Sequence, residues 1–531
     1  GVNSQNGLNV QGGVVAFNSG GALGAPSGLV TLGGGGSLQA LGDASILNPL
    51  HLLLGAQGGF NTGGHNIILS GPITGPGGLE MRGGGTLTLT GANTFGSLDV
   101  QGGTVVFASQ QALGAPGGQI ILGNGAGLVA GSGMVISQNL NVQGENARFD
   151  TGGNDVALNG VLTGRNCFIK AGAGRLSLNA AGSNEIGACV QQGQLAFNNV
   201  FSGQVWVDGD GTMSGSGRVN GDVEVDGVLS PGNSPGVLVV AGSVTQASGS
   251  VLELDIDGPT AGNGAGHHDQ LVLTGANSVY TAGGTIAPIT RGITGSANNT
   301  YTPQIGDSFQ VVSAEGGVTG SFTAIAQPTS GLAENTRFDV LYLPKAVVLA
   351  VTPTSYGALV AKAGKLNAQA VAAAADRDRP AAGQRGSAFA NGLVGLKRDG
   401  IVNTLQQAAG EIHADGMEAV LASSRATRGE VAGRMDDAFV TGRKVWGVAG
   451  ADRWDVDADA TAFGYRTDRS SMIFGIDQLL SDDLMVGVAV SYGESDVDGK
   501  LMGKARTSSY QAHGYAAWRS GAYYVNGVVS A

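Results

Sequence analysis

The sequence is poor in cysteine, in aromatic residues and in charge. Cys167 and Cys189 are the only cysteines among 531 residues, aromatic side chains make up 5% and charged side chains 13%. No run of 18 or more apolar residues occurs, which excludes a hydrophobic transmembrane helix. The net charge of −12 arises mainly in the first 350 residues. We therefore expect no nucleic-acid partner, because such binding rests on clustered Lys and Arg.

Glycine is the residue in excess, with 95 glycines in the chain. They follow no strict three-residue period, which excludes collagen. The hydrophobic fraction of 42% is ordinary for a folded protein and argues against disorder. The mixture predicts many short strands joined by tight turns. No signal peptide is recognisable at the N-terminus, and we expect the chain to be part of a longer one.

An internal repeat organises the first part of the chain. Residues 8–40 return as residues 98–130 without a gap, and about 19 of the 33 positions are identical. The similarity continues from 60–75 to 149–164 and, more loosely, from 84–94 to 173–184. Apolar residues alternate with polar ones within each copy, as in Leu87 and Leu89, and Gly-Gly or Asn-Gly pairs interrupt them. We predict a right-handed parallel β-helix with coils of roughly 20–25 residues, because stacked coils bury faces that single strands cannot.

The segment Gly232-Asn233-Ser234-Pro235-Gly236 fits the G-x-S-x-G pattern of hydrolase nucleophiles. A nucleophile elbow uses the backbone N–H of the residue after the serine, and Pro235 has none. The sequence is strand-like on both sides, whereas the elbow needs a helix behind it. We therefore interpret Gly232–Gly236 as a corner between strands and predict no catalytic residue.

Several segments resemble bacterial autotransporters, the type V secretion family. GVLSPGNSPGVLVVAG (227–242), GSVLELDI (249–256), HHDQLVLTG (267–275) and YTPQIGDSFQVVSAEGGVTGSF (301–322) are similar to the C-terminal end of their passenger domains. GGGTLTLTGANTF and the following LDVQGGTVVF (98–107) resemble the autotransporter-associated strand repeat. Residues 446–496 and 509–530 resemble the start of the translocator β-barrel, which is the most specific part of the match.

The C-terminal residues support this resemblance independently. Four stretches, Met472–Leu479, Leu484–Tyr492, Ser508–Trp518 and Ala522–Val529, alternate small or polar residues with apolar ones. Seven aromatic residues fit an interfacial girdle: Trp446, Tyr492, Tyr510, Tyr515, Trp518, Tyr523 and Tyr524. A soluble sandwich with an aromatic core is the alternative. About five strands precede Ala531, so we expect an incomplete barrel.

The domain prediction has four parts. Residues 1–218 are glycine-rich β-helix repeats, 219–350 form the C-terminal passenger segment that caps the β-helix and nucleates folding, 351–440 are a helical linker, and 441–531 are the first barrel strands. The resemblance implies that a helix at about 423–440 fills the barrel lumen, with Arg425, Arg428 and Arg434 facing an acidic wall. A solvated linker helix is the alternative.

Three other candidate sites fail on their residues. Gly306-Asp307-Ser308 resembles a motif of esterase autotransporters, but the sequence continues as a strand and a later Asp-x-x-His is absent. Asp455–Asp459 resembles a calcium loop, yet Ala460 and Arg466 stand where glycine and an acid are needed. His267, His268 and Asp269 could bind a metal, but we interpret them as a solvated turn. We predict no metal and no cofactor.

Cys167 and Cys189 are 22 residues apart, about one coil, so their strands would stack at ~4.8 Å. We predict a disulfide between them; two buried free thiols, or an exposed one, are the alternatives.

The functional prediction is a self-translocating surface protein: an outer-membrane barrel that exports a β-helical stalk with a structural or adhesive role. The alternative is a surface or secreted enzyme whose catalytic domain precedes Gly1. Expected partners are outer-membrane lipid, the barrel-assembly machinery and a host-cell or matrix ligand, and the passenger is expected to be monomeric.

Overall fold

The computed structural model describes residues 3–55, 57–182, 186–361, 366–381, 383–436, 439, 441–459, 462–499 and 502–531. These residues form two compact units. The first contains residues 1–352 with 380–386, and the second contains 353–379 with 387–531.

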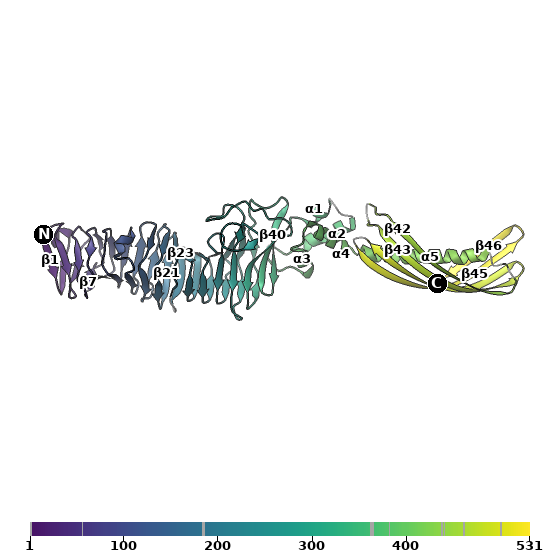
Figure 1. The fold of residues 1–531 in the computed structure, drawn as a ribbon, viewed down its shortest axis with the longest axis horizontal. Coiled ribbons are helices and arrows are strands. Elements are labelled where there is room, and N and C mark those ends of the chain that lie inside the picture. Colours follow the sequence, from purple (N-terminus) through teal and green to yellow (C-terminus); the bar gives the residue numbers. More distant parts are fainter. Residues whose placement is uncertain are drawn as a thin grey trace. The chain divides into compact units, whose positions relative to one another are not determined.

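The first unit is a β-solenoid of stacked, mostly parallel strands (Figure 1). One sheet contains β1 (Gly7–Val10), β3 (Leu29–Leu32), β6 (Leu50–Leu52) and β9 (Ile73–Thr74). A second contains β2 (Val14–Phe17), β4 (Ser37–Ala40), β7 (Gln57–Asn61), β10 (Gly78–Arg82), β12 (Ser97–Val100), β14 (Gln119–Leu122), β17 (Asn139–Val142) and β20 (Leu162–Gly164).

A third set of strands continues for most of the solenoid. It contains β5 (Ala44–Ile46), β8 (Asn66–Leu69), β11 (Thr86–Leu89), β13 (Thr104–Phe107), β15 (Gly127–Ala130), β16 (Met134–Ile136), β18 (Arg148–Asp150), β19 (Val156–Leu158), β21 (Cys167–Ala171), β22 (Arg175–Leu178), β23 (Gly187–Phe197), β25 (Val205–Gly215), β27 (Val223–Val225), β28 (Val228–Pro231), β30 (Val244–Gln246), β31 (Val251–Asp255), β35 (Tyr280–Ala282), β36 (Thr285–Ile289), β38 (Val318–Gly320) and β39 (Ala324–Ile325). The long strand β23 pairs with both β21 and β22, so it joins two neighbouring faces into one set.

The last coils carry a further sheet. It contains β24 (Val200–Ser202), β26 (Arg218–Asn220), β29 (Val237–Val240), β34 (Gln270–Leu273), β37 (Ser308–Ala314), β41 (Ala346–Pro353) and β40 (Thr336–Leu343). The short pair β32 (Thr260–Ala261) and β33 (His267–His268) lies in a loop between these strands.

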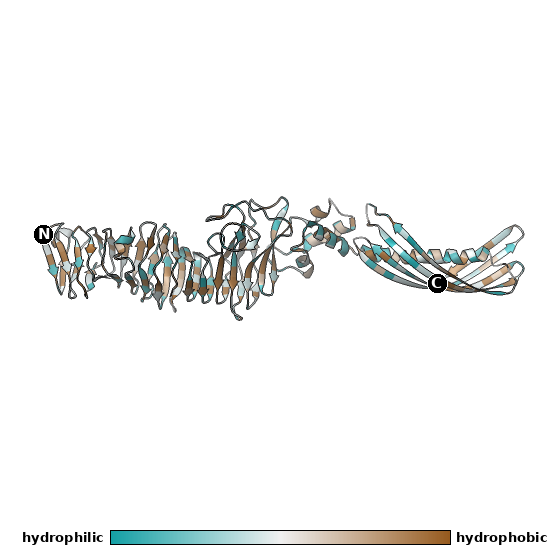
Figure 2. Cartoon of the chain, in the orientation of Figure 1, coloured by the Kyte–Doolittle hydropathy of each residue, from teal (hydrophilic) through white to brown (hydrophobic). Residues whose placement is uncertain are grey.

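Stacking of like residues explains why this sequence forms a solenoid. Val10 lies beside Leu32, and Leu32 beside Leu52 one coil later, all of them buried. Such columns form one continuous core from Val10 to Val351. Hydrophobic and hydrophilic residues alternate along the strands in Figure 2, as inward and outward positions require. The prediction of a β-helical fold made almost wholly of strand and turn is confirmed.

Coil length changes along the solenoid. Paired residues in the early and middle coils are 16 to 23 positions apart, close to the predicted coil, as for Val30 beside Leu50. In the last coils the spacing rises to 33–41, as for Leu271 beside Val312. The added residues form loops rather than core, so the stack of inward side chains is not interrupted.

The two sequence repeats adopt the same local structure. The 3₁₀ turns η1 (Gly20–Leu23) and η2 (Gln110–Leu113) occupy equivalent places, and Phe17 and Phe107 each make an edge contact with a phenylalanine of a later coil. Gly13 and Gly103 have φ angles of 77° and 73°, which explains the glycine at this turn in both copies.

The second copy is turned by one face around the solenoid relative to the first. Each coil has three strand positions, such as β6, β7 and β8, which belong to three different sheets. The strand β12 is the equivalent of β1, yet it pairs with β10 in the sheet that contains β2. Likewise β13, the equivalent of β2, pairs with β11. A copy therefore advances by four coils and one additional face.

Polar ladders support the outside and the corners of the stack. Asn233, Asn198, Asn179 and Asn159 form a chain of side-chain hydrogen bonds across successive coils, with distances of 2.8–2.9 Å. Such a ladder satisfies amide groups that would otherwise compete with the turns for backbone partners.

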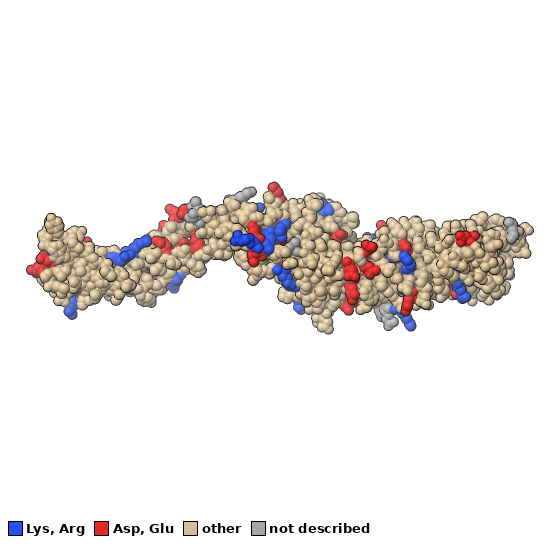
Figure 3. Space-filling model, turned by 180° about the vertical axis from the view of Figure 1, so that it is seen from behind, with Lys and Arg blue, Asp and Glu red and all other residues tan. Residues whose placement is uncertain are grey.

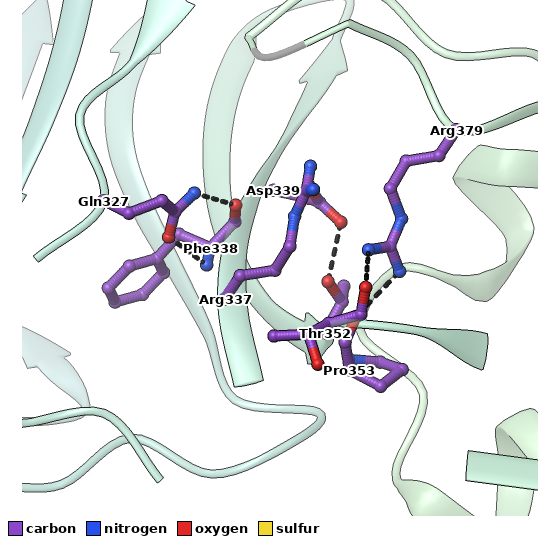
Figure 4. Close-up of polar contacts among 8 residues, drawn as sticks. Gln327, Arg337, Phe338, Asp339, Thr352, Pro353 and Arg379 are labelled. Atoms are coloured by element: carbon purple, nitrogen blue, oxygen red, sulfur yellow. Dashed lines mark hydrogen bonds and ion pairs between the residues drawn. The ribbon is translucent and has the colours of Figure 1, made fainter. Parts of the chain in front are cut away.

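An antiparallel hairpin covers the C-terminal end of the solenoid. β41 pairs antiparallel with β37, and β40 lies beside β41. Thr352 donates a hydrogen bond to Asp339 at 2.6 Å, and the Gln327 amide pairs with the backbone of Phe338 (Figure 4). These contacts pair polar groups where the parallel stack stops, which reduces the hazard of an open sheet edge.

The second unit begins with helices. They are α1 (Tyr356–Ala361), α2 (Leu366–Asp378), α3 (Ala388–Leu393), α4 (Arg398–Ala408) and α5 (Glu411–Asp436). The Asp376 carboxylate accepts hydrogen bonds from the backbone N–H groups of Tyr356 and Gly357, and so caps the start of α1. Among the described residues, no helix has the length and apolar character needed to cross a membrane.

Five long antiparallel strands follow: β42 (Arg443–Val456), β43 (Tyr465–Ser481), β44 (Leu484–Gly499), β45 (Gly503–Ser520) and β46 (Tyr523–Ser530). They pair in sequence order. Helix α5 contacts β43, β44, β45 and β46 on one face of this sheet (Figure 1).

Candidate functional site

The face of the sheet β42–β46 that contacts α5 is the most elaborate polar site of the second unit. Alternate residues of β43 are buried there: Thr467, Arg469, Ser471, Ile473 and Asp477. Tyr465 and Gly475 complete the buried row, in which four of the seven residues are polar or charged apart from the tyrosine hydroxyl. Because side chains alternate across a strand, this polar set predicts an aqueous or polar interior on the α5 side.

Arg469 connects the strands to the helix. Its guanidinium is 3% exposed and donates to Asp452 of β42 at 2.5 Å and to Glu430 of α5 at 3.2 Å. A third hydrogen bond reaches the backbone oxygen of Ser423 at 3.2 Å. A buried guanidinium with two carboxylates is a geometrically demanding contact, so it fixes the position of α5 along β43.

A second link lies one turn of helix beyond. Arg434 of α5 donates to Asp477 at 3.1 Å, and the Tyr515 hydroxyl donates to the same carboxylate at 3.3 Å. The Trp446 ring nitrogen donates to the Tyr515 hydroxyl at 2.7 Å. Trp446 and Tyr515 are therefore part of the α5 face, and their prediction as interfacial girdle residues is wrong.

The helix lies close to the sheet at Gly493. A Cβ atom at this position would lie 2.9 Å from the Ser423 hydroxyl and 3.0 Å from the Ser509 hydroxyl, which is too close. Gly493 on β44 therefore leaves the space that Ser423 occupies.

The predicted charge pattern of the helix is only partly correct. Arg434 faces an acidic residue of the sheet, as expected, but Arg428 is exposed and Arg425 pairs with Glu418 of its own helix at 3.3 Å. The central contact has the reverse arrangement, since the sheet contributes Arg469 and the helix contributes Glu430. The helix also begins at Glu411 rather than near residue 423; positions 437, 438 and 440 lie outside the described residues.

The opposite face of the sheet carries an apolar band, beside which lie exposed ion pairs such as Arg466 with Asp455. Met472, Phe474, Val488, Val490 and Tyr510 are all more than half exposed there. They form neighbouring rows across the sheet, since Met472 pairs with Tyr492 and Tyr492 with Tyr510. A sheet with one polar and one exposed apolar face is typical of outer-membrane barrels, where lipid covers the apolar side.

Comparison with known families agrees with this arrangement. Residues 445–531 match the family described as "Autotransporter beta-domain". The chain carries an autotransporter β-domain. The β-domain lies in the outer membrane, and the β-solenoid is its passenger, exposed at the cell surface.

Two curated relatives match parts of the chain. A segment of 172 residues, 30% of this chain, is 36% identical to the "Adhesin BmaC autotransporter" of Brucella suis biovar 1 (strain 1330), and it covers 5% of that protein. A segment of 421 residues, 70% of this chain, is 25% identical to an "Extracellular serine protease" of Serratia marcescens and covers 38% of it. The chain thus spans well under half the length of these relatives.

Within the autotransporter passenger, the Gly232–Gly236 segment forms a tight loop. Gly232 and Ser234 have φ angles of 94° and 60°, and the Ser234–Pro235 peptide bond is cis. The Ser234 hydroxyl lies 3.3 Å from the Thr294 hydroxyl and also interacts with Asp255. Asn233 of this loop accepts from Arg175 at 2.5 Å and ends the asparagine ladder.

Residues 267–269 do not form the solvated turn that the sequence suggested. His268 and Asp269 are 3% and 0% exposed. The Asp269 carboxylate accepts the backbone N–H of Gly236 at 2.6 Å and that of Asp255 at 2.8 Å. Asp269 therefore joins the Gly232–Gly236 loop to strand β31. The sequence did not indicate that Asp269 is buried, because a charged residue beside two histidines is usually exposed.

Asp255 and Asp269 form a buried carboxyl pair. Burial raises the pKa of Asp255 to about 6, with Glu253 and Asp257 adding to the shift and the Ser234 hydrogen bond opposing it. Burial, and then the negative charge of Asp255, raise the pKa of Asp269 well above its ordinary value. The pair thus favours a proton in the folded passenger.

The calcium-loop and esterase-motif candidates take part in structural contacts. Asp455 pairs with Arg466 at 2.9 Å, and Ser308 begins strand β37. Within the described ranges, no group of three or more His, Cys, Asp or Glu side chains has the arrangement of a metal site.

Cys167 and Cys189 are joined by a disulfide in the structure, and their Cα atoms lie 6.0 Å apart. Cys167 pairs in register with Gly187, so the bond runs diagonally between adjacent coils. The redox state in the cell stays a prediction that thiol counting tests.

Proposed function

We propose that the passenger is a structural and adhesive stalk and that the residues of this chain have no catalytic role. The observation that supports this most strongly is the single core that continues from Val10 to Val351. Such a stack suits a rigid, quasi-one-dimensional element that presents a long surface. The 36% identity to an adhesin autotransporter points in the same direction.

The other partners follow from the same proposal. The exposed apolar rows of β43, β44 and β45 favour contact with outer-membrane lipid, and folding of the β-domain would depend on the barrel-assembly machinery. A host-cell or matrix ligand would bind the passenger, which we propose to be monomeric because its core is closed by its own coils.

The second candidate function is a surface or secreted enzyme whose catalytic domain precedes Gly1. The similarity of 421 residues to an extracellular serine protease favours it. In that case the solenoid would be the carrier of the enzyme rather than the binding element.

One display experiment separates the two. The full protein is expressed on non-adhering Gram-negative cells, and attachment to epithelial monolayers is counted against cells that display the β-domain alone. The stalk proposal expects a several-fold gain in attachment that a serine-protease inhibitor does not change. Unchanged attachment together with inhibitor-sensitive cleavage of casein would favour the enzyme instead.

A further inference from the structure

A shallow groove lies on the outward face of the first passenger coils, across strands β4, β7 and β10. Its volume is about 430 Å³, and the backbone of Gly35, Gly55 and Gly59 forms part of its lining. Gly34, Val14 and Phe60 also line it, together with six polar side chains: Ser37, Gln39, Gln57, Asn61, Glu80 and Arg82.

The absence of a side chain at Gly59 makes the groove. Gly59 pairs with Ser37 on one side and with Glu80 on the other, so it is the middle of an outward row. The next residue, Phe60, is fully buried and points inward. The row therefore lacks a side chain at Gly59, and the neighbouring Ser37 leans over it, since a Cβ on Gly59 would lie 2.7 Å from that of Ser37.

The second repeat copy lacks this gap. Arg148 occupies the position equivalent to Gly59, and it pairs with Gly127 and Ile169 in the equivalent strands β15 and β21. The Arg148 side chain lies over Gly127. Three further groove residues are replaced by apolar ones in that copy, where Val129, Ile169 and Ala171 stand for Gln39, Glu80 and Arg82. The groove thus belongs to the first copy alone.

The lining carries polar groups but no net charge. Glu80 and Arg82 pair with each other at 2.7 Å, and the other polar side chains of the lining are amides and a hydroxyl. A polyanion would need clustered positive charge, and charged side chains are sparse over most of the face shown in Figure 3. Amides, carboxylates and guanidinium groups offer the paired donors and acceptors that neighbouring sugar hydroxyls need.

An extended peptide fits the groove less well. Peptides often bind a sheet by adding a strand to a free edge, but β7 is already paired with β4 and β10. An apolar anchor would have only Val14 to contact at the edge of the groove.

We propose that this groove binds a neutral oligosaccharide chain through Gln39, Glu80 and Arg82. This inference rests on the proposed adhesive function and names the class of ligand that the stalk would recognise. The second repeat copy suggests how to block the groove. Its Gly127 and Arg148 show that the fold accepts glycine and arginine at the positions of Ser37 and Gly59.

The test uses the full chain, purified in detergent, and fluorescently labelled maltohexaose, xylohexaose and chitohexaose. The blocking variant combines Ser37→Gly with Gly59→Arg, and the matched control makes the reciprocal change, Gly127→Ser with Arg148→Gly. We expect at least one hexasaccharide to bind the unmodified chain and the control equally, and the blocking variant about tenfold or more weakly. Gln39→Val, which introduces the residue of the second copy, should weaken the same binding if the blocking variant fails to fold.

Failure to bind any of the three hexasaccharides would overturn the inference, as would equal binding by all folded variants. Preference for a heparin-derived hexasaccharide or for an unstructured decapeptide would also contradict it. Failure of the groove proposal can be told apart from failure of the adhesive function by measuring the attachment of cells that display each variant. Attachment without saccharide binding leaves the adhesive stalk standing, whereas saccharide binding without attachment leaves the groove standing and removes the adhesive role.

Discussion

Lys170 shows how a single charged residue can belong to the core of a solenoid. It lies in register between Phe149 and Val190 and is fully buried. Its amine donates to the backbone oxygens of Ala171, Gly172 and Gln192 at 2.7–3.0 Å. Burial lowers the pKa of Lys170 to about 8, with Asp150 opposing the shift. The three carbonyl groups replace the water that the amine loses.

Replacing this lysine should be costly although the new side chain is apolar. We expect Lys170→Met to lower the free energy of unfolding by about 2–4 kcal/mol, because three buried carbonyl oxygens lose their donor. Chemical denaturation measures the change. Lys345→Met, at an exposed position, is the control, and an equal loss in both variants would contradict this role of Lys170.

The Asp255–Asp269 pair gives the passenger a pH-dependent stability. The pKa of Asp255 is raised to about 6 in the folded state, so the folded passenger binds more protons than the unfolded chain above about pH 4. Stability should therefore fall as pH rises from about 4 to 6, by roughly 1–3 kcal/mol. Thermal melts at pH 4.5 and 7.5 should show the higher melting temperature at pH 4.5.

A neutral variant tests whether this pair is the cause. Asp255→Asn combined with Asp269→Asn should flatten the pH dependence between 4 and 6, because burial also raises the pKa of Asp269. Asp210→Asn, at an exposed position, should leave the dependence unchanged. A profile that stays steep in the double variant would assign the effect to other groups.

Residue roles were predictable only where a local rule applied. The corner at Gly232–Gly236 followed from Pro235, whereas the inward position of Arg434 was implied only by the resemblance to autotransporters. Arg469 was missed because a cation on a barrel strand has no local signature until its partner helix is known. The polar alternation of Thr467, Arg469 and Ser471 was the available signal. Asp269 was misjudged because its partners, Gly236 and Asp255, are distant in sequence.

At the scale of elements, the buried guanidinium of Arg469 is the central contact that positions α5 on the sheet. Arg469 joins Glu430 and Asp452, whereas Arg466 of the same strand lies on the opposite face and pairs with Asp455. With a cysteine in place of Ser424, labelling by a large maleimide from outside intact cells should be slow. Arg469→Gln should make it several-fold faster, because the helix loses its fixed position.

Arg466→Gln is the matched control for this experiment, since it removes the same charge from the same strand. Its labelling rate should equal that of the parent. Rapid labelling of the parent itself would place Ser424 outside a protected lumen.

The disulfide between Cys167 and Cys189 acts on two adjacent coils. Thiol counting on unfolded, unreduced protein should find no free thiol. Replacing both residues by serine should lower the free energy of unfolding by about 3 kcal/mol, the chain-entropy value for a loop of this length. Two free thiols per chain would contradict the bond.

At the scale of the whole passenger, the best-covered end should be the most stable. The coils in 219–350 have long loops and end in the hairpin of β40 and β41, and stacked repeats gain stability from neighbours and from a capped end. Limited proteolysis should therefore degrade 1–200 first. Loss of 219–350 before the N-terminal coils would contradict this order.

The architecture itself was largely predictable, and its details were not. Period-two alternation, glycine turns and the 90-residue repeat led to a solenoid because stacking is the only way for such strands to bury their apolar faces. The lengthened last coils and the antiparallel hairpin were not foreseen, since extra loop residues leave the inward pattern unchanged.

The rotation between the two repeat copies has a consequence for how the stalk meets its surroundings. Each copy advances four coils and one face, so it rises by roughly 2 nm at about 4.8 Å per coil and turns by about a third of a revolution. Equivalent surface features therefore follow a screw around the axis. Gene duplication that lengthened this stalk would aim each new copy of a groove in a new direction, and only every third copy would point the same way. A longer stalk would sample the space around the cell rather than repeat one contact.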